Sequence, residues 1–252
     1  MDMSPEALVR EHTVYACVMG SRAFGLATED SDTDVRGVYL APTPLFWLFD
    51  KPPAHVEGPA PEQFSWELER FCELALRNNP NVLECLHSPL VTHTTAWGDE
   101  LLALRGAFLS RQAHGTFVRY AGGQRRKLEA DVRQYGHPRW KHAMHLLRLL
   151  SSCRDLLRTG ELRIEVGGDR ERLLAVKRGE LGWAEVEAWM NRLQDEADDA
   201  LAVSPLPPAP DHARVQDLLV RARRASALQD VRPGAHDEVV EGVTGPDGVR
   251  QP

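Results

Sequence analysis

Two short stretches near the N-terminus combine residue types that handle phosphate and divalent cations: Gly20-Ser21 and Asp32-Thr33-Asp34. The apolar run at residues 14–19 precedes the first stretch and predicts a buried strand. A Gly-Ser turn after a strand can present backbone N–H groups to a phosphate. Aspartates at i and i+2 on a strand point to the same side, where a cation relieves their repulsion. With hard oxygen ligands we expect this cation to be Mg²⁺, so the pattern predicts phosphoryl or nucleotidyl transfer.

The order and spacing of these residues resemble the signature of the DNA polymerase β-like nucleotidyltransferase superfamily. The longer string GSRAFGLATEDSDTDVRGVY, residues 20–39, is similar to its branch of predicted RNA-repair-associated nucleotidyltransferases. Residues 78–84, Asn-Asn-Pro-Asn-Val-Leu-Glu, and the pattern Lys141-x-x-x-His145-x-x-Arg148-Leu149 resemble the same branch. The matching segments run from about residue 14 to residue 181.

The resemblance implies three metal-binding carboxylates that are also catalytic. Asp32 and Asp34 would hold two Mg²⁺ ions, with Mn²⁺ as the alternative metal. A third carboxylate on a later strand would complete the site and help to deprotonate the acceptor. Counting back from the Glu-Leu-x-x-Phe segment that starts at Glu67 places it at Glu62, and Glu57 is the competing candidate.

The resemblance also implies a nucleotide-binding set. Gly20 would allow close backbone approach, and the Ser21 hydroxyl would contact the β- or γ-phosphate. Arg22 is either a second phosphate ligand or a salt-bridge partner of the acidic loop. Lys141, His145 and Arg148 would clamp the triphosphate, with Arg148 making a forked contact.

The segment 140–158 is the clearest predicted helix, with an apolar stripe at positions 143, 146, 150, 153 and 157. We expect Lys141, His145 and Arg148 on the opposite face, where an ordinary solvated surface is the alternative to a clamp. Asn81 either caps a helix junction or contacts a base or ribose. We expect His93, His137 and His142 to be structural or exposed, and the Phe and Trp residues to belong to the core.

The expected fold is α+β: a small polymerase β-like α/β domain with a mixed sheet, followed by a helical domain, with the active site between them. We place the catalytic domain at residues 1–98, the helical domain at 99–203, a linker and last helix at 204–228, and a disordered tail at 229–252. Asp211 is the expected N-cap of the last helix. Strands are expected at 14–19, 34–40 and 62–65, and helices at 5–11, 66–77 and 82–86. The Pro-rich stretch 42–61 predicts a loop.

Charge is unevenly distributed along the chain. Residues 1–110 hold 7 Lys or Arg and 16 Asp or Glu residues, whereas residues 111–172 hold 14 and 7. The net charges of these parts are −9 and +7, in a chain of net charge −7. An acidic half followed by a basic segment suits an enzyme with a polyanionic substrate.

The remaining composition narrows the class of protein. No apolar run reaches the length of a membrane span, and the N-terminus has no apolar signal core, so we expect a cytoplasmic protein. The four cysteines show neither a zinc spacing nor a disulfide framework, which predicts buried free thiols.

These observations favour a Mg²⁺-dependent nucleotidyltransferase that moves an NMP from an NTP, such as ATP, to an acceptor hydroxyl. An RNA end is one acceptor, and it rests on the resemblance alone. The alternatives are AMP transfer to a protein or a small molecule, and a catalytically inactive nucleotide-binding protein.

Overall fold

A computed structural model describes residues 4–29 and 31–229. Its five-stranded sheet has the strand order β3-β4-β2-β1-β5. The sheet is mixed, as expected: β2 and β4 are parallel, and the other neighbouring pairs are antiparallel. The strands are β1 (Thr13–Met19), β2 (Asp34–Tyr39), β3 (His55–Glu57), β4 (Gln63–Glu67) and β5 (Val91–Thr94).

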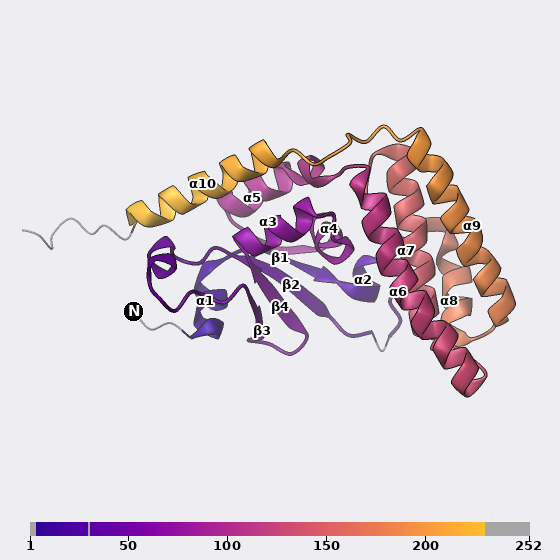
Figure 1. Cartoon of the computed structure of the whole chain (residues 1–252). Coiled ribbons are helices and arrows are strands. Elements are labelled where there is room, and N and C mark those ends of the chain that lie inside the picture. Colours follow the sequence, from indigo (N-terminus) through magenta and orange to yellow (C-terminus); the bar gives the residue numbers. More distant parts are fainter. Residues whose placement is uncertain (1–3, 30, 230–252) are drawn as a thin grey trace, which may run out of the picture.

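Helices surround the sheet and extend beyond it, with α6 to α9 packed together as a helical part (Figure 1). The helices are α1 (Pro5–His12), α2 (Gly20–Ala23), α3 (Leu68–Leu76), α4 (Pro80–Leu86), α5 (Ala96–Ala103), α6 (Gln112–Tyr135), α7 (Trp140–Thr159), α8 (Arg170–Arg178), α9 (Trp183–Ala202) and α10 (His212–Gln229). Three short 3₁₀ turns are η1 (Thr43–Trp47), η2 (Arg105–Phe108) and η3 (Gly167–Asp169).

The bounds of β1 and β2 agree with the sequence prediction to within a residue. The expectation that both aspartates lie on the second strand is wrong for Asp32, since β2 begins at Asp34. The sequence prediction missed β3 and β5. The three residues of β3 lie in the Pro-rich stretch that we assigned to a loop. All four residues of β5 are exposed, so it has no alternating apolar pattern.

The last helix, α10, packs against α3, α5 and the turns η1 and η2 (Figure 1). Asp211 accepts a hydrogen bond from the backbone N–H of Arg214 at 3.2 Å, which confirms the expected N-cap. On the same helix, Arg223 forms an ion pair with Glu67 at 2.9 Å and lies 4.0 Å from the ring centre of Phe46. The predicted disordered tail lies outside the described residues, apart from Gln229 at the end of α10.

One hydrophobic cluster runs from the sheet through α3 and α4 into the helical part. Helix α7 is its centre, since it packs against α6, α8 and α9. All four cysteines are buried and free, which confirms that expectation. Among the described residues, no helix is both long and apolar enough to cross a membrane.

Candidate active site

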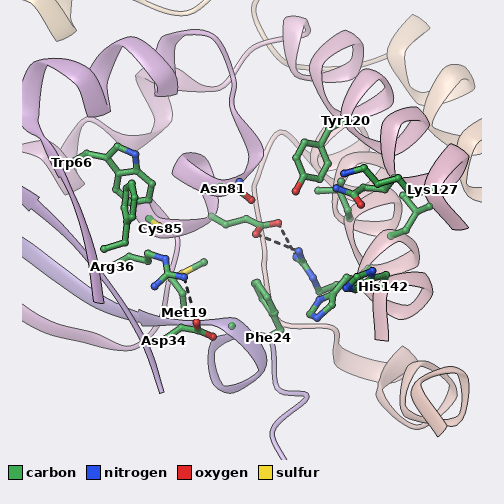
Figure 2. A pocket seen from close by; sticks show the side chains of 18 residues that line it. Met19, Phe24, Asp34, Arg36, Trp66, Asn81, Cys85, Tyr120, Lys127 and His142 are labelled. Atoms are coloured by element: carbon green, nitrogen blue, oxygen red, sulfur yellow. Dashed lines mark hydrogen bonds and ion pairs between the residues drawn. The ribbon is translucent and has the colours of Figure 1, made fainter. Parts of the chain in front are cut away.

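A cleft of about 650 Å³ separates the strand ends from the helical part (Figure 2). Asn81 and Glu84 of α4 lie between its two sides. We refer to the strand residues that line it as the sheet wall: Asp34, Arg36, Phe64 and Trp66. We refer to the residues from α6 and α7 as the helical wall: Tyr120, Gln124, Lys127, His142, His145, Leu146, Arg148 and Leu149.

Gly20 is the point where α2 meets the sheet wall. Its φ is +67°, in the left-handed region that favours glycine. A Cβ at this position would collide with the carboxylate of Asp34, so the close approach needs a residue without a side chain. The Asp34 carboxylate therefore lies directly against the Gly-Ser turn.

Asp34 begins β2, and Arg36 holds its carboxylate with an Nη2–Oδ1 distance of 3.3 Å. The parallel register pairs Val35 with Gln63, which places Glu62 beside Asp34 at the start of β4. Glu62 is exposed and has a φ of +56°. Its carbonyl accepts hydrogen bonds from the Val35 N–H and from Arg36 Nη1, both at 3.0 Å.

The two remaining acidic candidates lie on either side of this pair. Asp32 is exposed in the loop before β2. Glu57 belongs to β3, where it pairs with Phe64, so it lies one strand further from Asp34 than Glu62 does. The register thus places Glu62, and not Glu57, next to Asp34.

Arg148 contradicts the prediction of a hydrophilic helix face, since it is only 6% exposed. Its Nη1 and Nη2 contact the two carboxylate oxygens of Glu84 at 2.8 and 3.3 Å. Its guanidinium also lies 3.7 Å from the ring centre of Phe24. The reason is packing: α7 contacts α6, α8 and α9, so the Arg148 position on its polar face is buried, although the start of that face is exposed. The forked contact that we expected with phosphate is made with Glu84.

His145 and Lys141 differ in their surroundings. His145 lines the cleft, and burial, followed by the nearby Arg148 and Lys141, lowers its pKa to about 4. The imidazole is therefore neutral at pH 7 and can donate one hydrogen bond. Lys141 is exposed in the first turn of α7 and does not line the cleft.

The sequence matches the RNA repair pathway DNA polymerase beta family over residues 5–221. The chain belongs to this family. It is also 29% identical over 155 residues to YcgL of Bacillus subtilis (strain 168), a protein described as uncharacterized. That match covers 59% of this chain and 58% of YcgL, so the chain spans less than two thirds of its relative. No solved structure matches the chain significantly.

Membership of this polymerase β family raises the question of whether the residues of the site can bind a metal ion. Among the described residues, no group of three or more His, Cys, Asp or Glu side chains is placed to hold a metal. Mg²⁺ commonly needs only one or two carboxylates, because substrate phosphates and waters supply its other ligands. Asp34 lines the cleft, whereas Asp32 does not. Both residues offer the hard carboxylate oxygens that Mg²⁺ prefers.

The residues around the Gly-Ser turn hold the loop that carries Asp32. Arg22 Nη2 donates to the carbonyl of Ser31 at 2.9 Å, so Arg22 contacts the backbone of the acidic loop. The carbonyl of Ser21, in the first turn of α2, accepts from the Leu26 N–H at 2.8 Å. These bonds tie the loop and the helix into one unit.

The Asn-rich segment that marks the family has a structural part and an exposed part. Asn79 caps α4 by accepting from the Asn81 N–H at 3.0 Å, as expected of a helix junction. Asn78 is fully buried and donates to the carbonyl of Phe108 at 3.1 Å. Asn81 is exposed and lines the cleft, where it can contact a ligand.

Several cleft residues were not expected. Phe64 and Trp66, which we assigned to the core, are only partly buried and line the sheet wall. His142 is exposed, as expected, but it also lines the helical wall. Period-two spacing in β4 and the polar positions 120, 124 and 127 in α6 are signals that could have indicated these side chains.

Proposed function

We propose that this chain is a Mg²⁺-dependent nucleotidyltransferase that moves an NMP from an NTP to an acceptor hydroxyl. The observation that carries the proposal is the contact between Gly20 and Asp34. It joins a carboxylate to a Gly-Ser turn at the edge of a cleft that is large enough for a nucleotide. Membership of the polymerase β family supports the same chemistry.

In the proposed reaction, the acceptor oxygen forms a bond to the α-phosphorus, and the bond from that phosphorus to the pyrophosphate oxygen breaks. The divalent cation would stabilise the negative charge that develops on these oxygens. Asp32 and Asp34 would hold it. Glu62, beside Asp34 in the register, is our choice for the third carboxylate and for the group that takes the acceptor proton.

Arg36 competes with the cation for Asp34. It is anchored elsewhere, because its Nη1 donates to the carbonyls of Val35 and Glu62 at 2.9 and 3.0 Å. Its contact with Asp34 is longer, at 3.3 Å. We therefore expect Arg36 to stay in place when Asp34 turns to a bound cation.

The helical wall would hold the nucleotide. His145, neutral at pH 7, would donate to a phosphate oxygen, and Lys141 would add charge from the exposed start of α7. Arg148 would act differently from our first expectation: it positions α7 against α4 through Glu84. Asn81 lies in the same cleft and is our candidate for a base or ribose contact.

Incubation with each α-³²P-labelled NTP and Mg²⁺ tests the proposal, with RNA fragments, proteins or a small-molecule extract offered as acceptors. The proposal predicts label on one class of acceptor and release of pyrophosphate. Label on a protein or a small molecule would identify the alternative acceptors. Binding of NTP without transfer to any acceptor would indicate an inactive nucleotide-binding protein and contradict the proposal.

A further inference from the structure

The exposed side of α6 beside the cleft carries an unusual arrangement of charge. Four exposed residues form what we call the basic face of α6: Arg119, Arg126, Lys127 and Arg133. Three of them, the arginines, are spaced seven residues apart, so they lie in a row with steps of roughly 10 Å. The fourth residue, Lys127, also belongs to the helical wall.

In the described part of the chain, none of these four residues forms an ion pair. The two acidic residues of α6 are both paired elsewhere. Glu129 contacts Arg125 at 3.0 Å, and Asp131 contacts Arg139 at 3.5 Å. The basic face is therefore an uncompensated positive surface, although the chain as a whole has a net charge of −7.

Tyr120 connects this face to the cleft. It is 41% exposed, and it lies one turn or two from Gln124 and Lys127, which also line the cleft. Figure 2 shows Tyr120 and Lys127 across the cleft from Trp66 and Arg36. An exposed aromatic ring at the end of a basic row is the combination that binds single-stranded nucleic acid, since bases stack and phosphates pair with the charges.

We propose that the basic face of α6 binds the phosphates of a single-stranded nucleic acid, and that Tyr120 stacks on a base where the strand enters the cleft. This inference rests on the proposed function, because the bound strand would be the acceptor in the proposed reaction. A row of arginines has more charges than a mononucleotide can pair with, which favours a strand over the NTP as its ligand.

The test is fluorescence anisotropy of the full chain with a labelled single-stranded RNA, and with DNA of the same sequence, over a salt series without NTP. Changing Arg119, Arg126 and Arg133 to Ala together should weaken binding about a hundredfold near 0.1 M salt. The slope of log affinity against log salt should fall by about 2. The matched control changes Arg10, Arg192 and Arg214 to Ala; these exposed residues lie on α1, α9 and α10, and the change in net charge is the same.

Tyr120→Ala should weaken binding roughly five- to a hundredfold with an unchanged salt slope, because stacking releases no counterions. Equal losses in the two triple variants, or a wild type that binds neither RNA nor DNA, would overturn the inference. The inference would also be overturned if the triple change on α6 weakened binding to anionic vesicles but not to nucleic acid.

The outcomes separate this inference from the proposed function. Strand binding that follows these predictions in a protein that transfers no nucleotide would contradict only the proposed function. Nucleotide transfer to RNA that is unaffected by the triple change on α6 would contradict only the inference.

Discussion

The sheet wall and the helical wall of the cleft are built in different ways. In the sheet wall, backbone geometry places the groups: a glycine with positive φ admits Asp34, and the parallel register pairs Arg36 with Phe64. In the helical wall, side-chain packing decides, and the same helix that exposes Lys141 buries Arg148 against Glu84. Residues that the backbone places can be predicted from a short motif. Residues that packing places can be predicted only when the neighbouring elements are known.

The largest expected effect on stability concerns the buried pair Arg148–Glu84. Changing Arg148 to Met leaves Glu84 as an unpaired buried charge, which typically costs about 3–5 kcal/mol. The double variant with Glu84→Leu should recover most of this loss, since a buried pair can be replaced by apolar side chains. Urea unfolding of the three proteins measures both effects.

The same variants decide what Arg148 does. If Arg148 clamped phosphate, its change to Met would lower NTP affinity about ten- to a hundredfold. The free energy of unfolding would then change by less than about 0.5 kcal/mol. We expect the opposite order of effects, with stability changing most. Calorimetric titration with NTP, at a temperature where each variant is folded, separates the two roles.

A smaller effect on stability tests how backbone geometry places the sheet wall. Gly20→Ala should destabilise the protein, because Ala is strained at a φ of +67° and its Cβ meets Asp34. Gly25→Ala is the matched control: its φ is +71°, but nothing lies within 4 Å of the added Cβ. Both changes carry the left-handed strain of about 1–2 kcal/mol.

The difference between the two glycine variants isolates the collision with Asp34. We expect Gly20→Ala to lose up to about 1 kcal/mol more than Gly25→Ala in thermal or urea unfolding, because the Asp34 side chain must rotate away from the added Cβ. Equal losses would mean that Asp34 does not need the open space at Gly20.

Near neutral pH, the smallest effect comes from the titration of His145. Its pKa is about 4 in the folded chain and near 6.5 when unfolded, so the unfolded chain binds the proton first as pH falls. The free energy of unfolding should therefore decrease from about pH 6.5 to pH 4, by at most about 1.4 kcal/mol per pH unit. His145→Gln should flatten this slope.

His87 provides the comparison for that experiment. Burial, followed by Arg105, lowers its pKa to about 4 as well, but it lies outside the cleft. The variants His145→Gln and His87→Gln should flatten the unfolding profile alike. Only the His145 variant should change how NTP affinity depends on pH.

The sequence could predict what local pattern determines. Local pattern predicts the strand that ends before Gly20, the strand that begins at Asp34, the helix over residues 140–159 and the cap at Asp211. These features follow from apolar runs, periodicity and capping chemistry. The short strand β3 and the exposed strand β5 have no such pattern, because pairing with their neighbours creates them.

The candidate site divides in the same way. Gly20 and Asp34 come together as their motif indicates. The role of Glu62 as the third carboxylate, which follows from its distance to the next helix, stays a prediction. Arg148 does not follow from helical periodicity, because its partner Glu84 lies 64 positions away along the chain. The cleft positions of Phe64 and Trp66 likewise depend on a helical wall that is distant in sequence.

The central claim is that Asp34 binds a catalytic cation, and nucleotide transfer by the Asp34→Asn variant tests it most directly. The change keeps the shape of the side chain and removes the charge. The assay measures transfer from an α-³²P NTP over a Mg²⁺ series, with circular dichroism to confirm folding. We predict a loss of about a thousandfold or more in turnover, on the order of 4 kcal/mol in the barrier, with the fold intact. Turnover in Asp34→Asn equal to that of the wild type, with the same Mg²⁺ dependence, would contradict the account.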